Sequence, residues 1–438
     1  MTQRRFEKSQ EIGPRFHELI PGGAHTYARG DDQFPQGMAP YVTRGEGCRV
    51  WDVDDNEFIE YSMGLRSVTL GHAYPDVIRA IAEQLPLGCN FGRPNTLELE
   101  CAERFLSMVS TADMVKFARN GSDTTTAAVK LARAYTGREM VALCQQHPFF
   151  SVDDWFISTT QTDAGIPQAT KNLTVSFSYN DLASLEALFA RHSQAIACVV
   201  MEPERLEQPQ NNFLAEVKAL CERHGTLLVF DEIVTGFRWH NGGAQAMYGV
   251  TPHLSCFGKA IANGFAFSAL AGARDIMELG GLHHERDRVF LLSTTYGAET
   301  VGLAAAMATM AVYQREDVIG HLSAVGRRLR RGVEGLINDH RLPGHFTVFG
   351  RDCCLFFGTN DEDKNPSQPF RTLFLQECLR RGLMAPSFIV SYAHQPDDID
   401  KTLEIVDQAL AVYAQALDSG IDGYLEGRPV KPVNRARN

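Results

Sequence analysis

The sequence predicts an α/β protein in which a large domain contains a mostly parallel sheet and a smaller domain is α+β. Two observations lead to this prediction. Between about residues 95 and 310, short apolar runs alternate with helical patterns, which is typical of βα units stacked around a parallel sheet. After about residue 311 the pattern changes to amphipathic helices with two strand-like runs. The 438 residues allow two or three domains of about 150 residues each.

The elements can be followed along the chain. Residues 49–61 alternate apolar and polar side chains around Asp54-Asp55-Asn56, which predicts a β-hairpin. The apolar runs 197–201 and 227–230 predict buried strands. The residues that recur at helical spacing between these runs are Phe213, Leu214, Val217, Leu220 and Cys221. One βαβ unit is therefore visible in the sequence.

The last third of the chain contains the predicted smaller elements. Residues 347–349 and 354–357 resemble strands, residues 358–368 read as a loop, and residues 397–413 form a closing helix. The tail after Gly420 is interpreted as a solvated end of the chain, because runs of charge are usually exposed. Its basic residues are Arg428, Lys431, Arg435 and Arg437.

Composition excludes several classes of protein. With 42 Lys and Arg against 53 Asp and Glu, the net charge of -11 would repel a phosphate backbone, so no nucleic-acid partner is expected. The sequence contains no run of eighteen apolar residues, so no membrane partner is expected either. The ten cysteines are irregularly spaced and form no Cys-x-x-Cys pair, which favours a reducing, cytoplasmic compartment.

Two carboxylates and one lysine follow the predicted strands. Glu202 follows the run 197–201 and Asp231 follows the run 227–230, and open parallel sheets bind ligands at the carboxyl ends of their strands. A helix N-cap or a structural ion pair explains Asp231 equally well. Lys259 comes about one βα unit later in an apolar context. A desolvated amine has a lowered pKa and attacks carbonyls, as Schiff-base chemistry requires.

Small polar residues begin the predicted helix that follows residue 117. Gly121 and Ser122 stand at its start, where unpaired N–H groups and the helix dipole suit a phosphate. An ordinary N-cap is the simpler interpretation of these residues taken alone. His283 and His284 lack the spacing of a His-x-x-x-His site, so no metal is expected.

Several motifs together carry a resemblance that covers nearly the whole chain. In chain order they are residues 21–23 (PGG), 45–47 (GEG), 51–54 (WDVD), 70–75 (LGHAYP), 131–138 (LARAYTGR), 230–238 (FDEIVTGFR) and 258–259 (GK). With these motifs the chain resembles the class III aminotransferases, which are pyridoxal phosphate (PLP) enzymes of fold type I. Within that family it is most similar to the glutamate-1-semialdehyde aminomutase branch.

The resemblance implies a role for individual residues. Lys259 matches the lysine that forms a Schiff base with PLP and shuttles the substrate proton. Asp231 matches the aspartate that pairs with the pyridine nitrogen, and Ile233 matches the aliphatic residue under the ring. Gly121 and Ser122 match the phosphate cradle. Thr294 matches a threonine that reaches the phosphate from the neighbouring subunit, which implies a homodimer with shared active sites.

The chain departs from the family in two places that bear on function. Where the family has Tyr-His-Gly to stack an aromatic ring on the cofactor, this chain has residues 146–150 (QHPFF). His147 is the favoured stacking residue, and Phe149 is the alternative. Arg29 stands where the aminomutase has an arginine for the substrate carboxylate, which a guanidinium fork suits well. A surface arginine is the alternative interpretation of Arg29.

The resemblance predicts an aminotransferase that moves an amino group from an amino-acid donor to an aldehyde or ketone acceptor by a ping-pong mechanism. The alternative is a glutamate-1-semialdehyde 2,1-aminomutase, in which one substrate supplies both amine and carbonyl. The expected domains are a PLP-binding domain at 66–315, a small domain at 316–438 and an N-terminal segment at 1–65 that joins the small domain.

Overall fold

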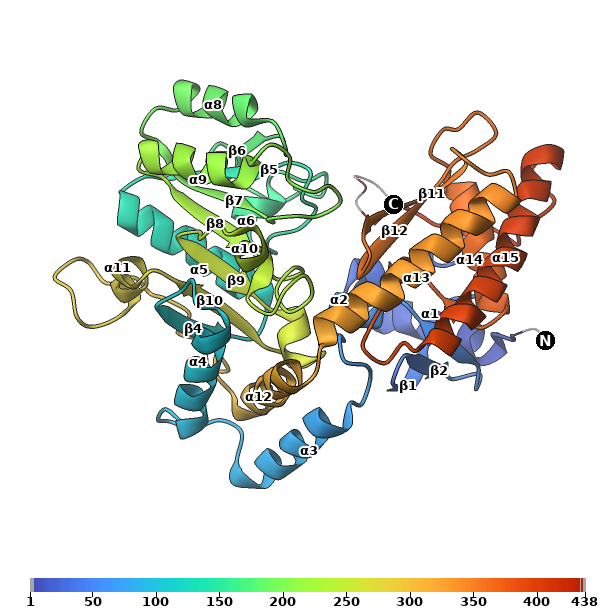
Figure 1. The fold of residues 1–438 in the computed structure, drawn as a ribbon, viewed down its shortest axis with the longest axis horizontal. Helices are drawn as coiled ribbons and strands as arrows, with labels where there is room; N and C mark the ends of the chain where they lie inside the picture. The colour runs from blue at the N-terminus through green and yellow to red at the C-terminus, as the bar shows by residue number, and fades with distance from the viewer. Residues whose placement is uncertain (1–3, 434, 436–438) are drawn as a thin grey trace. The chain divides into compact units, whose positions relative to one another are not determined.

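The computed structural model describes residues 4–433 and 435, and the chain folds into two compact units (Figure 1). Unit 1 combines the described residues up to Tyr74 with those from Gly320 onward, and unit 2 consists of Pro75–Ile319. The sequence-based domain ends at 65 and 315 stay a prediction.

Unit 2 is built on a seven-stranded sheet with the order β4-β10-β9-β8-β7-β5-β6. Its strands are β4 (Met114–Ala118), β5 (Met140–Cys144), β6 (Thr174–Phe177), β7 (Ile196–Met201), β8 (Leu227–Asp231), β9 (Leu254–Phe257) and β10 (Ser268–Gly272). β10 is antiparallel to both of its neighbours, β4 and β9, and the other neighbouring pairs in the sheet are parallel. The predicted α/β class with a mostly parallel sheet is confirmed.

Helices cover both faces of this sheet, as Figure 1 shows. The helices of this unit are α3 (Pro75–Gln84), α4 (Thr96–Met108), α5 (Gly121–Thr136), α6 (Asp154–Ile157), α7 (Gln168–Lys171), α8 (Leu182–Arg191), α9 (Phe213–Arg223), α10 (Gly243–Tyr248), α11 (Arg274–Met277) and α12 (Thr300–Arg315), of which α3 packs against α12. Because both faces are buried, the strands read as continuous apolar runs rather than alternating ones.

Alternation of side chains along β8 decides which core each residue joins. Leu227 and Val229 pack in the core that contains α5, whereas Leu228 and Phe230 pack in the core that contains α8 and α9. With a period of two, the next residue, Asp231, belongs to the α5 face. The end of β8 therefore presents a carboxylate on the side of the sheet where α5 lies.

Unit 1 contains two smaller sheets and the remaining long helices. The sheet β1-β2-β3-β13 consists of β1 (Val42–Glu46), β2 (Arg49–Asp52), β3 (Glu57–Glu60) and β13 (Leu383–Met384). The sheet β11-β12-β14 consists of β11 (Phe346–Arg351), β12 (Cys354–Thr359) and β14 (Phe388–Ile389). The helices are α1 (Glu7–Leu19), α2 (Met63–Arg66), α13 (Val318–Asp339), α14 (Gln368–Arg380) and α15 (Pro396–Ser419).

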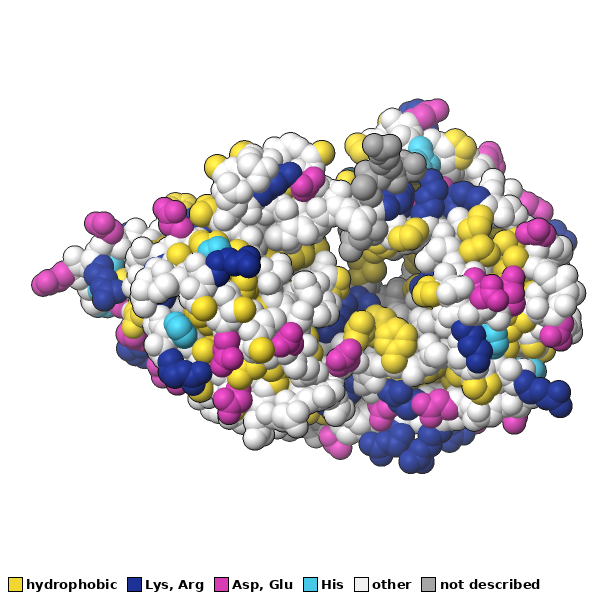
Figure 2. Space-filling model, turned by 90° about the horizontal axis from the view of Figure 1, so that it is seen from above, with side chains coloured by type: hydrophobic (Ala, Val, Ile, Leu, Met, Phe, Trp, Pro, Cys, Tyr) yellow, Lys and Arg dark blue, Asp and Glu magenta, His cyan; other side chains and the backbone are white. Residues whose placement is uncertain are grey.

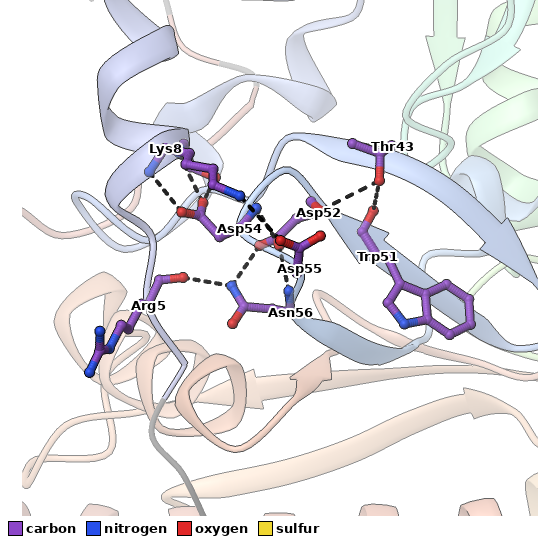
Figure 3. Close-up of polar contacts among 9 residues, drawn as sticks. Arg5, Lys8, Thr43, Trp51, Asp52, Asp54, Asp55 and Asn56 are labelled. Carbon is purple, nitrogen blue, oxygen red and sulfur yellow. Dashed lines mark hydrogen bonds and ion pairs between the residues drawn. The ribbon is translucent and has the colours of Figure 1, made fainter.

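The predicted hairpin forms between β2 and β3, and its turn is tied to α1 (Figure 3). Asp52 accepts hydrogen bonds from the backbone N–H groups of Asp54 and Asn56, which closes the turn. The Asp54 carboxylate accepts the backbone N–H groups of Lys8 and Ser9, at 2.7 and 2.9 Å. These N–H groups belong to the first turn of α1, where the helix itself offers no partner. The hairpin turn therefore caps α1 from outside.

The interpretation of the tail as solvated is wrong at Val430, whereas other described tail residues such as Pro429 and Pro432 are exposed. Val430 is only 4% exposed, and its backbone N–H donates to the Thr372 hydroxyl of α14. The physical reason is that α14 is buried on nearly all sides and carries polar groups that need partners. Arg437 lies outside the described residues.

The surface agrees with the mixed composition. Figure 2 shows acidic and basic side chains interspersed over the surface in view. Within the described part of the chain, no helix is both long enough and apolar enough to cross a membrane.

Candidate active site

Two carboxylates emerge side by side at the carboxyl ends of β7 and β8. Met201 pairs with Phe230 in the parallel ladder, so Glu202 and Asp231 follow at the same level. Both side chains are buried, with 2% and 3% of the residue exposed. An ionised carboxylate in such a place requires a nearby cation or hydrogen-bond donors. Two buried carboxylates that need stabilising partners therefore lie close together at this edge of the sheet.

The ionised form of the buried Asp231 carboxylate is poorly stabilised. Its Oδ1 accepts the backbone N–H of Ile233 at 2.9 Å. Burial, and next the charge of Glu202, raise its pKa to about 8, although the Ile233 N–H and the Lys259 ammonium act in the opposite direction. A cationic group next to Asp231 would stabilise the ionised carboxylate.

Glu232, the next residue, has a different environment. Its carboxylate accepts the backbone N–H groups of Ala244 and Gln245, at 2.9 and 2.7 Å, and the Thr235 hydroxyl. The two N–H groups lie in the first turn of α10, so Glu232 acts as a helix cap. Burial nevertheless raises its pKa to about 7. Of the two acidic residues, Glu232 has the capping role that the sequence left open for Asp231.

Lys259 follows β9 and is half-buried. Its φ of 47° lies in the left-handed region, which non-glycine residues seldom adopt. This conformation starts the short 3₁₀ turn Lys259–Ala262 directly after the strand. The ammonium is close enough to lower the pKa of Asp231. Lys259 and Asp231, predicted from separate strand ends, thus share one electrostatic site.

The start of α5 lies against the same site through Ile233. A Cβ at Gly121 would stand 2.3 Å from Ile233 Cδ1, so a larger residue here would displace the Ile233 side chain. Asn120 and Asp123 form a capping box, and the Ser122 hydroxyl accepts the N–H of Val152 at 3.1 Å. The N-cap predicted as the simpler interpretation is present. The first turn of this 16-residue helix also offers backbone N–H groups to an anion.

His147 is buried next to Glu202, with 3% exposed. Its Nδ1 accepts the backbone N–H of Glu202 at 2.9 Å, which leaves the ring proton on Nε2. Burial lowers the pKa of His147 to about 4, so the ring is neutral at pH 7. Phe149, the alternative stacking residue, is 51% exposed and packs its ring edge-on against Phe156.

Two of the predicted site residues, Thr294 and Arg29, are exposed. Thr294 lines a cavity of about 440 Å³ together with Lys116 and Phe117. Arg29 belongs to unit 1, where it ends the exposed 3₁₀ turn η2 (Tyr27–Arg29). The structure therefore groups Lys259, Asp231, Ile233 and Gly121 in unit 2 and leaves Arg29 in the other unit.

One charged neighbour of the site was missed by the sequence analysis. Arg205 Nη1 lies 3.2 Å from the Glu202 carboxylate, and its charge acts on His147. The spacing of three residues between Glu202 and Arg205 was the available signal, but in a loop it predicts no contact by itself.

Comparison with known proteins decides the family. Residues 27–410 match the model of the family described as aminotransferase class III. The chain belongs to this family. A protein of Desulforudis audaxviator named glutamate-1-semialdehyde 2,1-aminomutase is 33% identical over 431 residues, which cover 93% of this chain and 98% of that protein.

Solved structures of other proteins share the fold. The FumI protein of Sphingopyxis sp. MTA144, solved in a form that carries PLP, has a TM-score of 0.87 and 28% identity. It covers 95% of this chain and 99% of its own. A glutamate-1-semialdehyde aminomutase of Pseudomonas aeruginosa PAO1 has a TM-score of 0.80 and 20% identity over 93% of this chain and 95% of its own. These likenesses agree with the fold type I prediction.

Proposed function

We propose that this class III family member is a PLP-dependent enzyme whose cofactor is held at the carboxyl edge of the unit 2 sheet. The residues present fit the group. Asp231 is a buried carboxylate whose raised pKa calls for a neighbouring cation, which a protonated pyridine ring supplies. Gly121 has no side chain that could block its own backbone N–H in the first turn of α5, and such a turn suits a phosphate.

PLP, when bound, supplies an aldehyde for Schiff-base formation and a ring that takes up the electron pair left at the substrate Cα. Lys259 would hold the aldehyde carbon through its amine and then carry the proton that leaves Cα. Asp231 would pair with the ring nitrogen. Ile233 would pack under one face of the ring, and the neutral His147 would stack on the other.

The phosphate would be held by backbone N–H groups of Gly121 and Ser122 and by the Ser122 hydroxyl, because each can donate a hydrogen bond to an oxygen. Backbone donors explain how a chain with a net charge of -11 holds an anion. Arg29 would bind a carboxylate of the substrate. Ten cysteines without a disulfide among the described residues fit the expected cytoplasmic location.

The reaction that the relatives favour is the aminomutase, which the sequence analysis placed second. The supporting observation is that relatives at 32 and 33% identity, each spanning more than 90% of the chain, carry that name. We therefore propose a 2,1-amino shift within one carboxylate-bearing amino aldehyde. The second candidate remains the aminotransferase, favoured by the sequence 146–150 that departs from the family pattern beside the cofactor site.

A donor experiment separates these two reactions. For the aminomutase, we expect purified holoenzyme to convert glutamate-1-semialdehyde into the isomer with its amine on C1, without an added donor. The visible absorbance of the bound cofactor should then persist in L-glutamate or L-alanine alone. Bleaching by either amino acid without any isomerisation would overturn the aminomutase in favour of the aminotransferase.

The homodimer is proposed from the exposed apolar residues of unit 2. Leu87, Phe290 and Tyr296 are 70, 68 and 54% exposed, and the last two flank Thr294 in the sequence. Apolar side chains of this size on a surface often mark an interface. A second copy of the chain would cover them and place Thr294 at the neighbouring phosphate.

Complementation between two impaired variants tests whether the two subunits share an active site. Co-expressed Lys259→Ala and Thr294→Ala chains should form mixed dimers in which one of the two sites has both residues intact. We expect activity well above that of either variant alone at low PLP concentration. Activity no higher than the sum of the separate variants, in dimers shown to be mixed, would contradict the shared site.

A further inference from the structure

The described tail of unit 1 lies along α14. We call residues 424–433 together with Arg435 the strap. The backbone N–H of Glu426 donates to Gln376 Oε1 at 3.0 Å, and Gln376 Nε2 donates to the Tyr424 carbonyl at 2.9 Å. The N–H of Val430 donates to the Thr372 hydroxyl at 2.8 Å. Thr372 and Gln376 are four residues apart, so they lie on one face of the helix.

These contacts explain why α14 tolerates polar residues in its interior. Gln376 is fully buried and Thr372 is 2% exposed. A buried amide or hydroxyl without a partner is destabilising by about 1–3 kcal/mol. The strap backbone supplies the partners, and Arg380 forms an additional ion pair with Glu426. The strap is therefore bound to unit 1 along its length.

The strap also contacts the segment that follows Arg29. The Lys431 N–H donates to the Asp32 carbonyl at 2.9 Å, and the Arg428 N–H donates to Gln36 Oε1 at 2.9 Å. Gly427 has a φ of 104° and approaches Gln36 so closely that a Cβ would stand 2.7 Å from its Oε1.

An ion pair also joins the strap to this segment. Arg435 Nη2 lies 2.6 Å from Asp32 Oδ2, and both side chains are 24% exposed. Burial alone would raise the pKa of Asp32, but hydrogen bonds from Gln33 and Arg435 and the charges of Arg435 and Arg428 lower it. Asp32 is therefore ionised at pH 7.

Arg29 is joined directly to the segment that the strap holds. It ends the turn η2, and after Gly30 the turn η3 (Asp31–Gln33) contains Asp32. Three-residue 3₁₀ turns have little stability of their own. The strap contacts reduce the conformational freedom that an exposed segment would otherwise lose on binding a ligand.

We propose that the strap positions Arg29 for the substrate carboxylate, with Arg435 and Asp32 as positioning residues. The proposal rests on the role given to Arg29 under the proposed function. It adds a device outside the family pattern, because the match to the family ends at residue 410 and the strap begins after it. The strap would act on substrate binding and leave the chemistry at Lys259 unchanged.

The test uses single substitutions in the full-length holoenzyme. Arg435→Gln removes the ion pair with Asp32 but leaves the backbone contacts to α14. The matched control is Arg328→Gln, which removes the ion pair with Asp400 in the same unit, away from the strap contacts. We expect Arg435→Gln to raise KM for the carboxylate substrate about fivefold at constant kcat. Arg435→Lys should restore most of the affinity, and Arg328→Gln should leave KM within twofold of the unaltered enzyme.

A double-mutant cycle with Arg29→Gln isolates positioning from general damage. If the strap acts through Arg29, Arg435→Gln should raise KM in the unaltered chain and have almost no further effect in Arg29→Gln. A KM effect of the same size in both backgrounds would overturn the proposal. So would an unchanged KM in Arg435→Gln while Arg29→Gln raises KM, which would leave the proposed function standing. An unchanged KM in Arg29→Gln would refute the role of Arg29 itself, and the strap proposal with it.

Discussion

The carboxyl edge of the unit 2 sheet and the Arg29 segment of unit 1 are built by different physical means. Asp231 and Lys259 are fixed at the ends of buried strands, and Ile233 packs against Gly121. Arg29 is exposed at the end of a 3₁₀ turn of only three residues. It depends on neighbours such as the strap, which is distant in sequence.

This difference separates the two tasks that we assign to the regions. Groups that move protons or pair with the cofactor must hold their positions closely, and strand ends provide that rigidity. A residue that selects the substrate can lie on a segment whose contacts change without disturbing the sheet. We therefore expect substitutions at the sheet edge to lower kcat and substitutions around Arg29 to raise KM.

The largest expected effect is that of Lys259→Ala. Loss of the amine that holds the cofactor and carries the proton should lower kcat by roughly 1000-fold or more, equivalent to about 4 kcal/mol of transition-state stabilisation. The visible absorbance of the Schiff base should disappear. Lys218→Ala is the matched control, because Lys218 is a partly buried lysine of α9 in the same unit, where it forms an ion pair with Glu222. Normal turnover by Lys259→Ala would refute the site.

The neighbouring acids Asp231 and Glu232 should separate chemistry from stability. Asp231→Asn should lower kcat by about 100-fold or more, because an amide cannot keep the ring nitrogen protonated. Glu232→Gln leaves acceptors for only part of the N–H groups at the start of α10, and should lower the free energy of unfolding by about 1–3 kcal/mol. Steady-state kinetics and urea unfolding measure the two effects. The reverse pattern would show that Asp231 is the structural residue.

The pH dependence of the free energy of unfolding of the apoenzyme should show a smaller, independent effect. The pKa of Asp231 is raised from 3.8 to about 8 in the folded chain, so between these values the folded state binds the proton that the unfolded state has lost. The Asp231 contribution therefore makes the free energy of unfolding fall as pH rises, by about 1 kcal/mol per pH unit. Glu232 also titrates in this range, so the difference between the unaltered apoenzyme and Asp231→Asn is the informative quantity. It should be measured by urea unfolding from pH 5 to 8, and a difference independent of pH would contradict the assignment.

The parts of the site that could be predicted from sequence are those that local patterns determine. A strand buried on both faces is a continuous apolar run, so the next polar residue marks its end, and this located Glu202 and Asp231. The capping residues before α5 are equally local. The resemblance then distinguished Asp231 from an ordinary cap, which periodicity alone could not do.

The parts that could not be predicted depend on partners far along the chain. Glu232 caps a helix that begins eleven residues later only because the chain folds back to it. The strap looked like a charged tail because its binding is carried by backbone N–H groups, which have no sequence pattern. Its partners, such as Gln376, are recognisable only once α14 is known to be buried. Local pattern therefore revealed the sheet edge and left the support of Arg29 hidden.

The smallest predicted effect concerns the hairpin turn that caps α1, in the same unit as Arg29 (Figure 3). Asp54→Ala removes the acceptor for the Lys8 and Ser9 N–H groups and should lower the free energy of unfolding by about 1–2 kcal/mol. Asp55→Asn is the control, because the Asp55 side chain is 90% exposed, its ion pair with Lys8 at 3.1 Å is worth little, and asparagine tolerates the left-handed φ of 63° at this position. Urea unfolding should distinguish the two variants. Because α1 lies far along the chain from the strands that carry Lys259, kcat should stay unchanged in both. A fall in kcat with Asp54→Ala alone would show that the two regions are coupled, and the division of tasks between them would then be wrong.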